Sequence, residues 1–191
     1  MARTGDLLRQ GDTDTMLFRS AAADSEGSFL EVEAEYDPMR DVRPPVHRHP
    51  RQDEHFEIIS GTMSFLVEDE LHEIGPESSI DIPRNTFHTV WNNGTERARF
   101  IWRTTPALKT EDMYVTLWGL ADEGRMGRHG QPRPPFLQSV CLMYGYRDEY
   151  RLAKPAYPVM LPLSALLTPV ARLLGYQPYY QRYSSRPALP Q

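Results

Sequence analysis

Three histidines and one glutamate are the residues of this chain whose types and spacing could hold a transition metal. His47 and His49 stand two positions apart, Glu54 follows His49 by five positions, and His88 comes from a separate run. Three imidazoles and one carboxylate make a ligand set for a divalent metal that leaves coordination positions open. Such a metal acts as a Lewis acid and template, and iron can also activate dioxygen.

The spacing of the two paired histidines requires an extended backbone. Side chains at i and i+2 share a face on a strand, whereas on a helix they diverge by roughly 200°. Pro44 and Pro45 oppose a helix that would run into this pair. After a short turn, a strand-like run follows in which Glu54, Phe56 and Ile58 share one face. The carboxylate can therefore return to the two histidines across the turn.

His88 lies in a second predicted strand, residues 87–91, which is entered through a turn at residues 83–86. Asp53 and Glu57 are rival carboxylates, but the spacing favours Glu54. The remaining histidines are expected to be structural or solvated: His55 on the opposite strand face, His72 beside a hairpin and His129 in a loop.

Two motifs of the cupin superfamily resemble these two runs. The first motif is Gly, His-x-His, Glu and a second Gly, and the matching residues are His47, His49, Glu54 and Gly61. The second motif ends in Pro-x-Gly-x-x-His and an Asn, matched by Pro83, His88 and Asn92. The resemblance covers roughly residues 28–104, and the inter-motif spacing of about fifteen residues looks like the compact bacterial type. It implies that His47, His49, Glu54 and His88 are the metal ligands.

Three glycines of the family pattern are replaced in this chain. Asp41 stands where the first motif begins, Glu77 where the second begins, and Asn85 follows Pro83. Asn tolerates a left-handed backbone better than most residues, so Asn85 can serve its turn. For the loops at Asp41 and Glu77, the sequence does not predict the backbone shape.

The composition is that of one domain with an elaboration. The chain has 191 residues, of which 40% are hydrophobic, and a net charge of −5, which gives no reason to expect nucleic-acid binding. Cys141 is the single cysteine, so an internal disulfide is excluded and a reducing compartment is favoured. On an apolar helical face, it is expected to be a buried thiol. The polar N-terminus lacks the apolar stretch of a signal peptide, so we expect a cytoplasmic protein.

Residues 16–104 are predicted to be β-structure because apolar and polar residues alternate there. Leu30, Val32, Ala34 and Tyr36 alternate with glutamates, and the apolar positions between 98 and 104 alternate with arginines. Short, frequent strands indicate a barrel or sandwich, and the resemblance implies the cupin jelly roll, a double-stranded β-helix. We expect residues 1–105 to form this mainly-β domain.

Residues 106–191 are predicted to be a helical, proline-rich extension that packs on the barrel or on a partner chain. Two predicted helical faces are Met113, Leu117, Leu120, Ala121 and then Leu137, Val140, Cys141, Tyr144. Residues 124–135 read as a Gly- and Pro-rich connection between them. The third segment, Val159 to Leu174, has Arg172 as its one charge, and its length falls short of the roughly 20 residues of a membrane span. A lid or homodimer contact is favoured, with an interfacial membrane helix as the alternative.

The sequence favours a metal-dependent enzyme that acts on a small organic molecule. One divalent ion per chain is expected (Fe, Mn, Ni or Zn), and the resemblance implies an oxidoreductase of the dioxygenase kind or a metal-assisted isomerase or cyclase. A substrate enolate, diol or carboxylate could chelate at the open positions. Tyr36, Phe65 and Trp102 are candidate pocket residues, and no catalytic acid or base is identifiable. The competing class is a non-catalytic cupin that binds or senses a small ligand.

Overall fold

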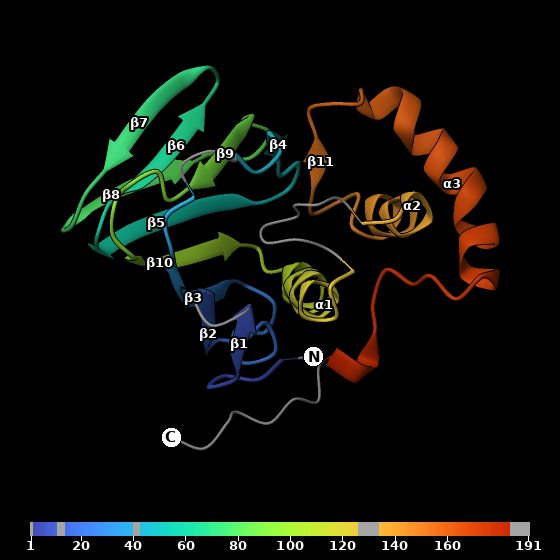
Figure 1. Ribbon diagram of the computed structural model, residues 1–191, viewed down its shortest axis with the longest axis horizontal. Helices are drawn as coiled ribbons and strands as arrows, with labels where there is room; N and C mark the ends of the chain where they lie inside the picture. The colour runs from blue at the N-terminus through green and yellow to red at the C-terminus, as the bar shows by residue number, and fades with distance from the viewer. Residues whose placement is uncertain (1, 11–13, 40–42, 126–133, 184–191) are drawn as a thin grey trace.

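Two antiparallel sheets with helices at the C-terminal side make up the architecture of the computed structural model, which describes residues 2–10, 14–39, 43–125 and 134–183 (Figure 1). The six-stranded sheet has the order β1 (Leu7–Gln10), β2 (Asp14–Ser20), β3 (Leu30–Tyr36), β10 (Ala98–Thr105), β5 (Asp53–Ser60), β8 (Ser78–Ile82). The five-stranded sheet has the order β11 (Arg151–Leu152), β4 (His47–Arg48), β9 (His88–Trp91), β6 (Met63–Val67), β7 (Glu70–Ile74). The predicted jelly roll with C-terminal helices is confirmed.

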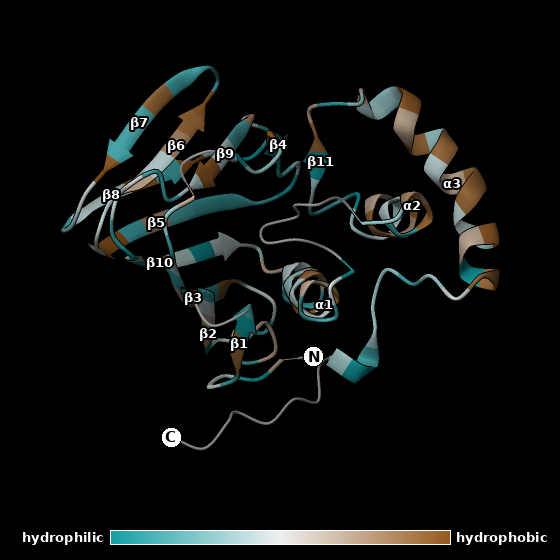
Figure 2. Cartoon of the chain, viewed as in Figure 1, coloured by the Kyte–Doolittle hydropathy of each residue, from teal (hydrophilic) through white to brown (hydrophobic). Residues whose placement is uncertain are grey.

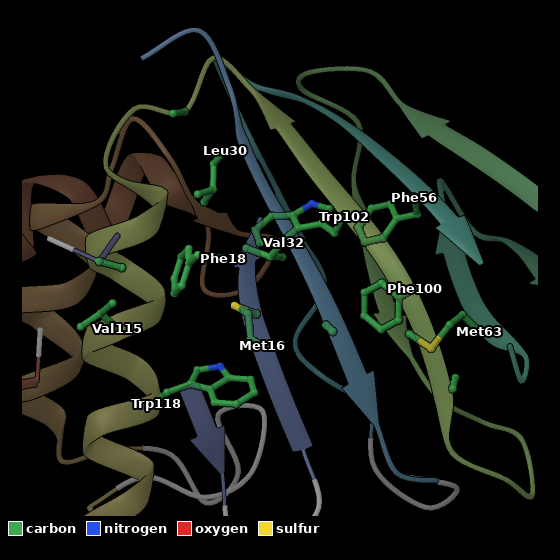
Figure 3. Packing of buried hydrophobic residues seen from close by; sticks show 14 of the residues in the cluster. Met16, Phe18, Leu30, Val32, Phe56, Met63, Phe100, Trp102, Val115 and Trp118 are labelled. Atoms are coloured by element: carbon green, nitrogen blue, oxygen red, sulfur yellow. The ribbon is translucent and has the colours of Figure 1, made fainter. Parts of the chain in front are cut away.

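The inward faces of the strands are those that the alternation predicted. Val32 of β3, Trp102 of β10 and Phe56 of β5 stand side by side in register, and all three are buried. Figure 3 shows them with Phe100 and Met63 in one apolar cluster, which draws residues from both sheets. Because the two sheets pack across this cluster, the face of β5 that carries Phe56 points inward. Glu54 lies on the same face of β5 and is therefore buried as well.

Arginine–glutamate pairs cover the outward face of the six-stranded sheet. Arg103 and Arg99 on β10 pair with Glu31 and Glu33 on β3, their register neighbours or near neighbours. Exposed pairs of this kind contribute only about 0–1 kcal/mol each. These ion pairs hold Glu31 and Glu33 on the outer face of the sheet, away from the histidines.

Helix α1 (Thr110–Asp122) extends the core of the six-stranded sheet. Val115 and Trp118 of α1 are buried beside Met16 and Phe18 of β2 (Figure 3). Of the predicted face, Met113 and Leu120 are buried and Leu117 and Ala121 are half-buried. The buried surface is wider than a single stripe because the 3-10 turn η2 (Gln181–Tyr183) covers α1 at Gly119, where a Cβ would stand 2.2 Å from the Tyr183 ring.

Helices α2 (Phe136–Gly145) and α3 (Tyr157–Leu173) pack on each other at the far side of the molecule (Figure 1). Cys141 is buried on α2, as expected. Ser164, Thr168 and Ala171 are the buried residues of α3, whereas Leu166 is 73% exposed. Brown bands in Figure 2 mark this apolar helix. Within the described part of the chain, α3 and the other helices are too short or too polar to cross a membrane.

Strand β11 was not predicted from the sequence, and it ties the C-terminal extension to the five-stranded sheet. Arg151 and Leu152 pair antiparallel with Arg48 and His47 of β4, and the Ala153 amide donates to the Val46 carbonyl at 2.9 Å. Of the predicted 124–135 connection, residues 126–133 lie outside the described residues, as does Asp41. The extension thus reaches the edge strand that carries the first histidine.

Candidate metal centre

The four residues singled out by the sequence lie together in the space between the two sheets. His47 on β4 pairs directly with His88 on β9, His49 follows β4 by one residue, and Glu54 lies on β5 of the opposite sheet. Ligand nitrogens of the three histidines all lie within 4.8 Å of one another. His49, Glu54 and His88 are buried and His47 is half-buried. His47 is therefore the least buried member of the cluster.

Backbone carbonyls fix the tautomer of all three imidazoles. The Nδ1–H groups of His47, His49 and His88 donate to the carbonyls of Pro45, Glu149 and Thr86 at 2.9, 2.6 and 3.0 Å. A carbonyl oxygen can only accept, so Nδ1 carries the proton in each neutral ring. Each Nε2 is left with a free lone pair. This is the arrangement in which histidine binds metals, because the second hydrogen bond orients the ring and raises its basicity.

Glu54 supplies the charge of the cluster. Its Oε1 accepts a hydrogen bond from the Trp102 indole N–H at 2.8 Å and lies 3.4 Å from His49 Nε2. Its Oε2 lies 2.8 Å from His88 Nε2, yet the approach is too poorly aligned to count as a hydrogen bond. A buried carboxylate oxygen without an aligned donor is costly. A cation among the imidazoles would satisfy it.

The electrostatics keep the cluster ready for a cation. Burial lowers the pKa of His47 well below its usual value, and the neighbouring His88 and His49 lower it further. Burial also lowers the pKa of His49. Although burial opposes ionisation of Glu54, the adjacent His49 and His88 bring the pKa of Glu54 down to about 2. At neutral pH the carboxylate is ionised and at least two imidazoles are neutral, which is the protonation state that metal binding requires.

A closer approach to Glu54, 2.8 Å against 3.4 Å for His49, sets His88 apart from the other two histidines. Burial lowers its pKa, but the carboxylate outweighs burial and the pKa of His88 is raised overall. A bound divalent cation would compete with the proton that Glu54 favours on the His88 ring. Nitrogen donors with one carboxylate suit Zn²⁺, Fe²⁺, Mn²⁺ or Ni²⁺. The residues present therefore fit a divalent transition metal.

The other histidines that the structure describes lie away from the cluster. His55 faces outward on β5, where its Nδ1 lies 2.7 Å from Asp81 Oδ1. His72 on β7 is half-buried, with its Nε2 3.9 Å from Glu70 Oε2. His129 lies outside the described residues. The rival carboxylates are also on the outside, since Asp53 pairs with Arg84 and Glu57 is exposed.

Aromatic side chains surround the cluster on the barrel side. Trp102 contacts Glu54 and packs on Tyr114 of α1 with ring centroids 4.9 Å apart. Tyr36 packs edge-on against Phe100 at 5.1 Å. Phe65 lies fully buried against Phe56, deeper in the core than the other two candidate pocket residues. Tyr36 and Tyr114 keep some exposure.

Three residues near the cluster were missed by the sequence: Tyr114, Glu149 and Tyr150. The Tyr150 ring stacks on the His47 imidazole with centroids 4.4 Å apart and an interplanar angle of 25°. Burial raises the pKa of Tyr114 well above its usual value, and Tyr36, Glu54 and Tyr150 raise it further. All three residues belong to the C-terminal extension, for which the sequence offered no motif.

A comparison with known proteins identifies the same part of the chain. Residues 34–103 match the family model of the cupin domain. An oxidoreductase of Arthrobotrys oligospora is 26% identical over 156 residues, which cover 75% of this chain and 60% of that protein. This chain therefore spans less than two thirds of that relative.

Solved structures with similar folds include KdgF from Halomonas sp., which is 15% identical with a TM-score of 0.46, over 56% of this chain and 92% of KdgF. A predicted oxalate decarboxylase from Thermotoga maritima is 13% identical with a TM-score of 0.45, over 53% of this chain and 99% of that one.

Proposed function

Because this chain belongs to the cupin superfamily, we propose that it holds one divalent transition metal and uses it to act on a small organic molecule, as an oxidoreductase. One observation carries the proposal. Each of the three imidazoles donates its Nδ1–H to a backbone carbonyl, and ligand nitrogens of the three rings lie within 4.8 Å of one another. The buried Glu54 carboxylate lies 3.4 Å from His49 Nε2 and 2.8 Å from His88 Nε2. A site used only for packing would have no need of three such oriented lone pairs.

The protein residues would orient the ligands and exclude water. The carbonyls of Pro45, Glu149 and Thr86 hold the three rings, and the Trp102 indole holds the Glu54 carboxylate. When bound, the metal would supply Lewis acidity and, as iron, access to dioxygen chemistry. The aromatic side chains near the cluster would contact the body of the substrate.

The substrate would carry a chelating group, such as an enolate, a diol or a carboxylate. Three neutral imidazoles and one carboxylate leave a divalent ion with a net charge of about +1, which favours an anionic oxygen ligand. The partly exposed rings of Tyr36, Tyr114 and Tyr150 would present apolar faces and hydroxyl groups to it. The oxidoreductase name of the relative from Arthrobotrys oligospora supports oxygen or redox chemistry over isomerisation.

Titration of the apo protein with Co²⁺ tests the metal site, because cobalt reports its ligand field by visible absorption. We expect one equivalent to bind to the wild type. His49→Ala and His88→Ala should lose most of the affinity, and the outward-facing His55→Ala should keep it. Azide added to the cobalt form should change the spectrum, because a catalytic site keeps an open coordination position. Full cobalt occupancy in His47→Ala/His49→Ala would overturn the proposal.

Oxygen uptake tests the reaction class. Iron-loaded protein is mixed with acetylacetone or catechol as chelating probes, and zinc-loaded protein serves as the control. Uptake with iron and none with zinc supports the dioxygenase form of the proposal. Turnover without dioxygen would indicate the isomerase or cyclase form, and tight probe binding with no turnover under either metal would indicate a binding module.

A further inference from the structure

The segment 149–153 runs alongside the ligand-bearing edge of the five-stranded sheet. Its residues Arg151 and Leu152 form β11, which pairs with β4, the strand of His47 (Figure 1). The Ala153 amide donates to Val46, so the pairing continues for one more residue. Without this segment, the edge of β4 facing the extension would present unpaired backbone groups.

Two further contacts join this segment to the metal ligands themselves. The Glu149 carbonyl accepts the Nδ1–H of His49 at 2.6 Å, across 100 residues of chain. The Tyr150 ring stacks on His47 at 4.4 Å and meets His49 edge-on at 5.9 Å. Of the three carbonyls that orient the imidazoles, the other two come from residues two positions away in sequence. The ring of His49 is therefore oriented from outside the barrel.

The segment is itself held in place from both sides. The Glu149 side chain is buried, and its Oε1 accepts the Lys109 amide at the start of α1 at 3.2 Å. The Tyr150 amide donates to the Tyr146 carbonyl at the end of α2. Helices α1 and α2 thus fix the position of the carbonyl that His49 uses.

We propose that residues 149–153 are a clamp for the metal centre, in which the Glu149 carbonyl and the Tyr150 ring position His49 and His47. This inference rests on the proposed metal site. According to this proposal, the C-terminal extension positions two of the metal ligands. Metal affinity therefore depends on residues about 60 to 100 positions away in sequence from the barrel ligands. By linkage, metal binding stabilises the clamp in turn.

Substitution of Tyr150 tests the clamp through metal binding alone. Tyr150→Leu removes the ring from His47, Tyr150→Phe keeps it, and Tyr144→Leu makes the same change on α2, where the ring contacts Arg147 instead. Co²⁺ affinity is measured by chelator competition, together with the visible spectrum. We expect Tyr150→Leu to weaken binding by about 10- to 100-fold and to shift the spectrum. Tyr150→Phe and Tyr144→Leu should match the wild type.

Hydrogen exchange on the unmodified protein gives a second readout that no folding defect can imitate. We expect amides of residues 150–153 to exchange more slowly when Zn²⁺ is added, while the β6–β7 hairpin stays unchanged. In His49→Ala this protection should disappear. If the wild type binds metal but Tyr150→Leu keeps its affinity and spectrum, or if exchange at 150–153 does not slow, the clamp is wrong. If the wild type binds no metal, the proposed function fails first.

Discussion

Gly61 joins β5 to β6 at a point where the structure has no room for a side chain. Its φ is +73°, and a Cβ there would stand 2.7 Å from both the Ala98 Cα and the Arg97 carbonyl oxygen. Gly61→Ala therefore incurs about 1–2 kcal/mol for a left-handed backbone. Displacement of the neighbouring β10 backbone adds about 1–3 kcal/mol. We expect the free energy of unfolding to fall by roughly 2–5 kcal/mol.

Two other glycines separate these two contributions. Gly27 also has a left-handed backbone, with φ +79°, but a Cβ there would meet nothing within 4 Å. Gly27→Ala should lose only the backbone contribution of about 1–2 kcal/mol. Gly75 has neither a left-handed φ nor a neighbour within 4 Å, so Gly75→Ala should be neutral or stabilising by up to about 1 kcal/mol.

Urea denaturation followed by tryptophan fluorescence measures all three variants. The expected order of stability is Gly75→Ala, then Gly27→Ala, then Gly61→Ala. Gly61 is seven residues beyond Glu54, about 23 Å along an extended strand, so folded Gly61→Ala should still bind one Co²⁺. Equal losses for Gly61→Ala and Gly27→Ala would refute the argument from close approach to β10.

Two further predictions concern helices α1 and α3. The Glu111 carboxyl accepts a hydrogen bond from the Ala22 amide at 3.0 Å, and burial raises its pKa. Ionisation of Glu111 is therefore disfavoured in the folded protein, and the free energy of unfolding falls as pH rises through the folded-state pKa. Glu111→Gln should therefore be more stable than the wild type at pH 7 and lose that advantage at pH 4 in urea denaturation, whereas a constant difference would contradict the assignment. Leu166 and Leu173 are 73% and 88% exposed. If a second copy covers them, Leu166→Ser/Leu173→Ser should lower the mass in sedimentation, and unchanged mass with lost vesicle binding would indicate the membrane alternative.

The central strands could be predicted because their signal is local. Alternation along β3, β5 and β10 marks one face as buried, and a shift by one residue would turn every apolar side chain outward. β1 and β11 carry no such signal. β11 has two half-buried residues, and its existence depends on a partner strand about 100 positions earlier. The pattern of apolar and polar residues within β11 cannot predict its pairing with a strand so distant in sequence.

The two replaced family glycines that the structure describes show that a backbone shape can persist after its usual residue is lost. Glu77 and Asn85 both have a left-handed φ, of 59° and 71°. Their amides donate to Ile58 and His49 respectively, so tertiary hydrogen bonds hold each turn in place of glycine's freedom. The resemblance located these turns, but only the structure supplies what stabilises them.

The ligand histidines and the groups that orient His49 differ in how they can be found. The clustering of His47, His49, Glu54 and His88 could be predicted because a metal site restricts residue type and spacing. The group that orients His49 is the backbone carbonyl of Glu149. Every residue has such a carbonyl, so the residue type at position 149 cannot predict this contact. A substitution anywhere in residues 149–153 that moves this carbonyl would alter the centre while leaving the motif intact. The clamp proposal therefore predicts that two proteins with identical ligand motifs differ in metal affinity when different chain segments pack against the ligand edge.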